Sequence, residues 1–183
     1  GVVTLALTVT VALLLRLRDE GDLRLLLPIG AVGALGVLTR PDTAGFLAVT
    51  GIVFVVTQPA FRRAGVAAVV VGGPVVVYGL TTLLRLRWYG ELVPITYELK
   101  VGGTSLVERA ERGAAVAAVA VTGHLVVYVF GVVLAAWRAT RNELATVALL
   151  VSPFVAALGC SVWTGGDAWE WMNYSNRFIA ATV

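Results

Sequence analysis

The sequence predicts an all-α polytopic membrane protein, a bundle of about six to seven transmembrane helices with extracytoplasmic loops and one short interfacial helix. Two observations support this prediction. Of the 183 residues, 58% are hydrophobic and 14% are charged, and the mean hydropathy is +0.89; an ordinary soluble domain has about 25% charged residues. Apolar runs also alternate with short polar turns along the whole chain. We therefore expect a single transmembrane domain over residues 1–183.

The first half of the chain contains four apolar runs. Residues 1–15 read as the end of a span whose start is missing, and residues 43–60 and 64–84 read as complete spans. Residues 25–39 form a shorter run, below the roughly 20 residues that a helix needs to cross the hydrocarbon core. Within residues 64–84, the sequence Gly72-Gly73-Pro74 indicates a kink or a close-packing point.

The second half begins with a helix-start signal. Ser105 and Glu108 match the capping-box pattern, which predicts a short helix at the membrane surface. Residues 113–136 and 144–164 follow as spans, and residues 178–183 open another. Because the chain begins and ends within apolar runs, we expect an internal fragment that lacks an N-terminal catalytic loop and a C-terminal part.

Two polar segments interrupt this pattern. The first polar segment, residues 85–103, carries five charged side chains between two long apolar runs, and the second polar segment, residues 163–177, mixes acids, amides, an arginine and three tryptophans. Aromatic residues such as Trp88, Tyr89 and Tyr97 are typical of a membrane–water boundary. We expect the two segments to face the same side of the membrane and to form one site.

The short loops suggest an orientation. Basic residues occupy alternate turns, and the positive-inside rule places these turns in the cytoplasm: they are Arg16, Arg18 and Arg24, then Arg62 and Arg63, then Arg138 and Arg141. The number of cations is the same on both sides and does not decide the orientation. The orientation is assigned from loop length, because the turns placed in the cytoplasm are the short and plainly basic ones. Arg40 and both polar segments are then extracytoplasmic, and the protein is expected in the cell membrane as a multi-pass protein.

Four cations of that face suit a lipid phosphate: Arg40, Arg85, Arg87 and Lys100. Cations at headgroup depth can neutralise the phosphate while nearby aromatic rings and hydrocarbon hold the lipid chain. The alternative is that these side chains only snorkel to the interface and anchor the ends of helices. Lys100 is the strongest candidate for binding because it is the only lysine in the chain.

The second polar segment suits a sugar. Asp167 and Glu170 can accept hydrogen bonds from hydroxyl groups or act as a general base, and Trp169 can stack on a sugar ring. They are the candidate catalytic residues, and Arg177 could pair with either acid. The alternative is an aromatic belt with a solvated acid. One histidine, His124, and one cysteine, Cys160, give little basis for a metal site, so neither a metal nor a cofactor is expected.

Three motifs resemble a known family. The sequence RWYGELVPITYELK at residues 87–100, the sequence LTRPD at residues 38–42, and the sequence GGD at residues 165–167 with Arg177-Phe178 are similar to motifs of polytopic GT-C membrane glycosyltransferases, akin to arabinofuranosyl- and mannosyltransferases. The motifs occur here in the family order. Ile95 departs from the usual asparagine, and Ala180-Ala181 departs from the usual proline. The family's acid pair lies in an N-terminal loop upstream of this sequence.

The resemblance implies a membrane glycosyltransferase. Such an enzyme moves a sugar from a polyprenyl- or dolichyl-phosphate carrier to a hydroxyl group of a glycan, lipid or protein acceptor, with Tyr89 and the second polar segment around the sugar or acceptor. No nucleic-acid partner is expected, because the net charge of +3 comes from cations scattered in loops. The alternatives are a multi-pass transporter or lipid flippase, which would place ionisable residues near mid-span, and a membrane subunit without activity.

Overall fold

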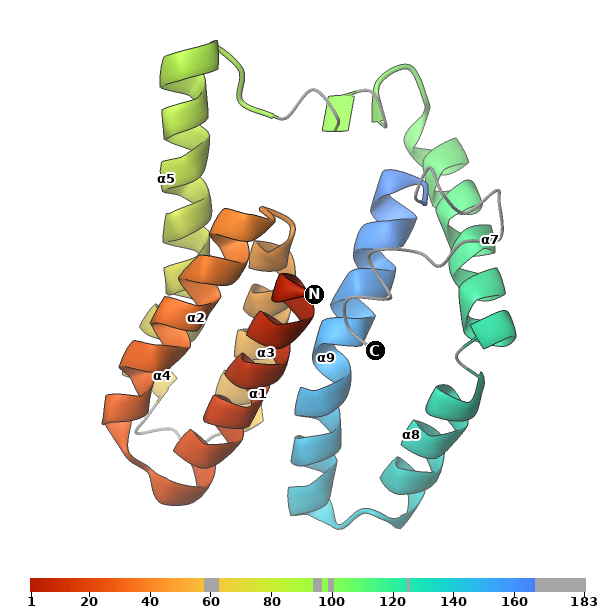
Figure 1. Cartoon of the computed structure of the whole chain (residues 1–183). Coiled ribbons are helices and arrows are strands. Elements are labelled where there is room, and N and C mark those ends of the chain that lie inside the picture. Colours follow the sequence, from red (N-terminus) through yellow and green to blue (C-terminus); the bar gives the residue numbers. More distant parts are fainter. Residues whose placement is uncertain (58–62, 94–96, 99–100, 125, 167–183) are drawn as a thin grey trace.

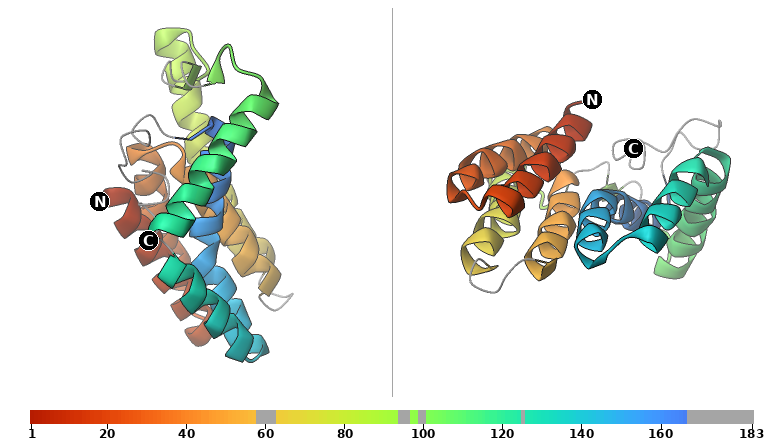
Figure 2. Two further views of the ribbon diagram at one scale, coloured as in Figure 1. Left: turned by 90° about the vertical axis from the view of Figure 1, so that its right-hand side faces the viewer. Right: turned by 90° about the horizontal axis from the view of Figure 1, so that it is seen from below.

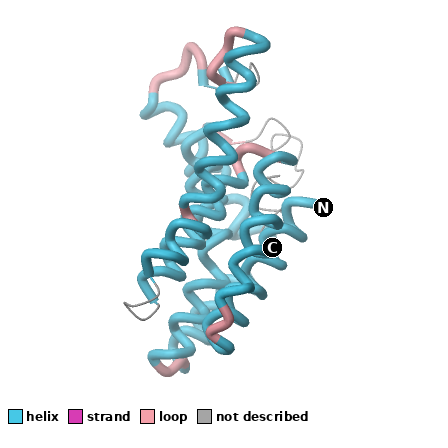
Figure 3. The backbone as a smooth tube through the Cα atoms, turned by 90° about the vertical axis from the view of Figure 1, so that its left-hand side faces the viewer, coloured by secondary structure: helices cyan, strands magenta, loops and turns pink. Residues whose placement is uncertain are grey.

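The computed structural model describes residues 1–57, 63–93, 97–98, 101–124 and 126–166. Within these residues the chain is helical apart from short turns and loops, and it contains no strand (Figures 1 and 3). The predicted all-α class is therefore confirmed for the described part of the chain.

The chain opens with an antiparallel hairpin of two helices. Helix α1 (Val2–Glu20) ends at Gly21, which adopts a left-handed conformation with φ 70°. Such a conformation at a helix C-terminus favours glycine because a Cβ atom would be strained there. A 3-10 turn, η1 (Leu23–Leu25), leads into α2 (Leu26–Thr39). The predicted charged turn is therefore shorter than expected, since Arg16 and Arg18 lie on the last turns of α1, and the chain reverses between α1 and α2 at one end of the bundle (Figure 1).

Helices α3 to α5 complete the first half of the molecule. Helix α3 (Thr43–Thr57) follows a tight turn at residues 40–42, and α4 (Arg63–Val70) and α5 (Gly72–Tyr89) are separated by a break at Val71. This break lies beside the predicted kink. Taken together, residues Ala64–Tyr89 form an apolar helical segment of 26 residues. It continues into the first polar segment and ends at Gly90, where φ is 73°.

The second half differs from the prediction at its start. Ser105 does cap a helix, since its Oγ accepts a hydrogen bond from the Glu108 backbone N–H at 3.2 Å. However, α7 (Leu106–His124) is one continuous helix, and its axis makes an angle of 81° with the axis of α8 (Val126–Arg138). The predicted short helix is therefore the start of a longer one, and the predicted span over residues 113–136 is divided between α7 and α8. Helix α9 (Arg141–Thr164) then returns along the molecule with Pro153 inside it.

The predicted six to seven spans are not confirmed within the described residues. In the part of the chain that the structure describes, two helical segments are long and apolar enough to cross a membrane, Ala64–Tyr89 and Glu143–Thr164, and α7 with α8 makes a third if the bent pair is one span. The apolar segments Leu23–Thr39 and Thr43–Thr57 are shorter. At about 1.5 Å per residue, the 15 residues of α3 cover about 22 Å of a roughly 30 Å core.

The core consists of two clusters of buried side chains shared among α1, α2, α3, α4 and α9. Phe46 and Phe54 of α3 are 1% exposed and pack among apolar side chains of the neighbouring helices. A view along the bundle shows α3 beside α9, with α7 and α8 outside α9 on the far side from α1 and α2 (Figure 2). Helix α9 therefore joins the two halves of the molecule.

Two polar contacts fasten α9 to the first half. The Ser152 hydroxyl lies 3.2 Å from the Thr50 hydroxyl in the buried α3–α9 contact. At the end that carries the basic turns, Arg18 Nη1 donates to Thr146 Oγ1 at 2.7 Å. Large apolar side chains such as Val127 and Phe130 of α8 remain exposed, as expected for surfaces that face lipid.

Candidate functional site at the polar end of the bundle

One end of the molecule gathers the termini of four helices. Figure 1 shows the C-terminal ends of α2, α5 and α9 and the N-terminal end of α7 all toward the top of the view, opposite the turn between α1 and α2 and the turn between α8 and α9. Arg40, the first polar segment and the start of the second therefore share one end of the bundle, called here the polar end. That the two segments form one site, and on which side of the membrane, stays a prediction.

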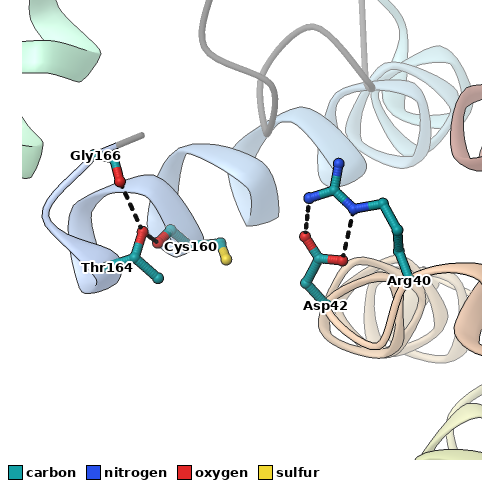
Figure 4. Close-up of polar contacts among 5 residues, drawn as sticks. All are labelled: Arg40, Asp42, Cys160, Thr164 and Gly166. Atoms are coloured by element: carbon teal, nitrogen blue, oxygen red, sulfur yellow. Dashed lines mark hydrogen bonds and ion pairs between the residues drawn. The ribbon is translucent and has the colours of Figure 1, made fainter. Parts of the chain in front are cut away.

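Arg40 is engaged by an acid. Its Nε donates to Asp42 Oδ1 at 3.1 Å and its Nη2 lies 2.5 Å from Asp42 Oδ2, so the two side chains form a bidentate ion pair (Figure 4). This pair fixes the turn between α2 and α3. A lipid phosphate at Arg40 would have to share the guanidinium with Asp42, and the role of Arg40 as a phosphate ligand stays a prediction.

Arg85 and Arg87 lie on the last turns of α5. Arg87 is exposed, together with Trp88 and Tyr89, which are 70% and 74% exposed. Arg85 is partly buried, and its Nη1 is shielded from solvent without a hydrogen-bond partner among the described residues. The predicted aromatic and cationic character of this helix end is present, and its side chains are accessible to a ligand or a lipid headgroup.

A hydrogen bond joins the two polar segments. The indole Nε1–H of Trp163, at the end of α9, donates to the hydroxyl oxygen of Tyr97 at 2.8 Å, across 66 positions of sequence. Tyr97 belongs to the first polar segment and Trp163 begins the second. These two residues are therefore in direct contact, and the expectation that the two segments form one site stays a prediction.

Arg109 of α7 completes this contact. Its guanidinium carbon lies 5.5 Å from the centroid of a Trp163 ring, within the range of a cation–π interaction. Trp163 therefore contacts two polar partners, Tyr97 at its indole N–H and Arg109 at its ring face. We call Tyr97, Arg109 and Trp163 the Arg–Trp–Tyr cluster.

The packing of α7 on α9 positions Arg109. A Cβ atom at Gly113 would lie 2.6 Å from the Cα of Val162, so the two backbones approach as closely as a glycine allows. Gly113 lies one helical turn after Arg109, and Val162 precedes Trp163. Because residues four apart share one helix face, the glycine contact places Arg109 against the end of α9.

The sequence interpretation missed Arg109, which it assigned to a short surface helix. The signal was the spacing between Arg109 and Gly113. A small residue four positions along marks the helix face on which a neighbouring backbone can approach, and an arginine on that face points at the same neighbour.

The end of α9 is a glycine turn. Gly165 and Gly166 have φ values of 74° and 90°, which only glycine adopts without strain. The Gly166 N–H donates to the Ser161 carbonyl at 2.8 Å, and the Thr164 hydroxyl donates to the Cys160 carbonyl at 2.9 Å (Figure 4). Cys160 is half-buried and packs on the core. The predicted sharp turn before residue 167 is therefore present.

Several predicted site residues lie outside the described residues: Lys100, Asp167, Trp169, Glu170 and Arg177. The roles proposed for them from the sequence stay predictions. In the described part of the chain, no group of three His, Cys, Asp or Glu side chains is arranged to hold a metal ion.

No protein-family model, curated protein or solved structure matches the chain.

Proposed function

We propose that the chain is part of an integral membrane glycosyltransferase that moves a sugar from a polyprenyl-phosphate carrier to an acceptor hydroxyl at the polar end of the bundle. The observation that carries the proposal is the Trp163–Tyr97 hydrogen bond, which joins a residue of the first polar segment to the first residue of the second. A donor of this kind has an anionic headgroup, a sugar and a long apolar chain. The polar end offers cations, aromatic faces and adjacent apolar helix surface for these three parts.

Each part of the donor has a matching group. The cations of α5 and Arg109 of α7 supply donors for a phosphate, and the exposed ring of Trp88 supplies a face for stacking. Apolar residues of α5 such as Leu83, which is 61% exposed, offer a surface for the lipid chain next to these groups. Asp167 and Glu170 stay the candidates for the general base that deprotonates the acceptor hydroxyl.

The test is a transfer assay with the whole protein in proteoliposomes. A polyprenyl-phosphate sugar labelled in the sugar is supplied together with candidate glycan, lipid and protein acceptors. We expect labelled product with the wild-type protein, its loss in Lys100→Ala and Asp167→Asn, and its retention in Arg138→Ala. Arg138 is the matched control because it is an exposed cation at the opposite end of the bundle. Wild-type turnover in Lys100→Ala would remove the phosphate-binding assignment of that residue.

The bend between α7 and α8 favours the alternative of a transporter or flippase. Broken helices are common at the substrate sites of secondary transporters, and the two axes here differ by 81°. The two functions are separated by the fate of the labelled donor. A transferase releases the sugar from its carrier, whereas a flippase moves the intact lipid between leaflets without cleaving it.

A further inference from the structure

The Arg109 guanidinium is a cation with unused hydrogen-bond donors. Its Nε and Nη1 are shielded from solvent and have no hydrogen-bond partner among the described residues. A buried donor without a partner is costly, and the cost is larger for a charged group. In the described part of the chain the ion pairs are Arg16–Glu20, Arg18–Asp19 and Arg40–Asp42, so no described carboxylate compensates Arg109.

The surroundings hold this guanidinium in place. The Trp163 ring lies on one side of it, at 5.5 Å from ring centroid to guanidinium carbon, and the Tyr97 hydroxyl in turn holds the indole N–H. A Cβ atom at Gly165 would lie 3.6 Å from Cα, Cβ and Cγ of Arg109, so the end of α9 packs along the stem of the side chain. A preorganised fork of this kind loses little conformational freedom when it binds a planar or tetrahedral anion.

Arg109 differs from the charged residues next to it on α7 in its burial. Glu108, Glu111 and Arg112 are all exposed to solvent, whereas Arg109 is partly buried against α9. Arg109 also lies near the N-terminus of α7, where the helix dipole favours negative charge. The electrostatics and the unused donors therefore both point to an anionic ligand.

We infer that Arg109 binds a phosphate group through its guanidinium, with Trp163 and Tyr97 as the residues that position it. Arginine matches the oxygen geometry of a phosphate. That this phosphate belongs to a lipid carrier rests on the function proposed above. The binding site itself does not depend on transfer activity, and a free phosphate has the same chemistry.

The experiment measures phosphate binding by the whole protein in phosphatidylcholine nanodiscs, using titration calorimetry. The probes are inorganic phosphate and a polyprenyl monophosphate. The variants are Arg109→Met, Arg109→Lys, and the matched control Arg112→Met, which removes an exposed arginine three residues further along the same helix. Arg109→Lys keeps the charge and removes the planar fork, and a melting curve of each variant reports whether it is folded.

We expect Arg109→Met to weaken binding by about ten- to a hundredfold, the range for a hydrogen bond to a charged group. Arg109→Lys should weaken it less, and Arg112→Met should bind like the wild type. Binding of both probes indicates a general phosphate site, and binding of the lipid phosphate alone indicates a headgroup site; both support the inference. Wild-type affinity in folded Arg109→Met or in Arg109→Lys, or failure of the wild-type protein to bind either probe, overturns it.

The same preparation separates this inference from the proposed function. If binding depends on Arg109 but no sugar is transferred, the glycosyltransferase proposal fails and the phosphate site stands. If sugar is transferred while the Arg109 variants bind both probes normally, the phosphate site fails and the glycosyltransferase proposal stands.

Discussion

Gly113 is the position at which a single methyl group should separate α7 from α9. In Gly113→Ala, the new Cβ would lie 2.6 Å from both the Cα and the carbonyl oxygen of Val162, and 2.8 Å from the carbonyl oxygen of Ser161. These are backbone atoms, so no side chain can rotate away. Because carbon atoms pack at about 3.5–4.0 Å, α7 must move by about 1 Å.

The expected cost of Gly113→Ala is about 1–3 kcal/mol, the usual range for overpacking. The measurement is the thermal unfolding of the whole protein in detergent. For a protein of this size, each kcal/mol lowers the melting temperature by about 2–4 °C. The displacement should also move Arg109 off the Trp163 ring and so change the tryptophan fluorescence.

Gly131→Ala is the matched control, because a Cβ atom at Gly131 of α8 would meet nothing within 4 Å. We expect its melting temperature to lie close to that of the wild-type protein. Equal melting temperatures for Gly113→Ala and Gly131→Ala would contradict the close backbone contact between α7 and α9. The positioning of Arg109 against the end of α9 by this contact would then be refuted as well.

Two further predictions concern the core. Gly51→Ala should also destabilise the protein by about 1–3 kcal/mol, since its Cβ would lie 2.9 Å from side-chain atoms of Val70 and Val71 and 3.1 Å from the Val70 carbonyl oxygen. The control is Gly45→Ala, because a Cβ atom at Gly45 of the same helix would meet nothing within 4 Å. Equal melting temperatures for the two variants would refute the α3–α4 contact. Removing the Thr50–Ser152 hydrogen bond should lower the free energy of unfolding by about 0.6 kcal/mol, as for other hydrogen bonds between membrane helices. The measurement is the coupling energy of a double-mutant cycle with Thr50→Val and Ser152→Ala. A coupling energy of zero would show that this bond adds nothing to the stability of the α3–α9 contact.

Local sequence signals located most of the helix ends. Ser105 and Gly165 occupy the cap and turn positions that their residue types predict, because caps and left-handed glycines depend on a few neighbouring residues. Arg85 and Arg87 were predicted in a polar segment after the span, whereas they lie on the last turns of α5 itself. In contrast, the sequence has no proline or glycine pair at the break between α7 and α8 that would predict the 81° angle between them.

The predicted span count is not confirmed within the described residues, and the reason is physical. Hydropathy measures how apolar a run is, and it does not report whether the run packs as a partial span against other helices. Helix α3 is as apolar as a spanning helix, yet its 15 residues are shorter than the hydrocarbon core, and Phe46 and Phe54 are buried by neighbouring helices instead of facing lipid.

The sequence by itself determined the helical class, the two polar segments and the residue types available at the polar end, because these depend on composition and on short-range patterns. Only the tertiary structure decided which side chains meet there. The Trp163–Tyr97 bond spans 66 positions and Arg109 reaches Trp163 from a different helix. The contact between Arg109 and Trp163 depends on how closely the backbones of α7 and α9 approach, and that distance is set by the packing of Gly113 on Val162.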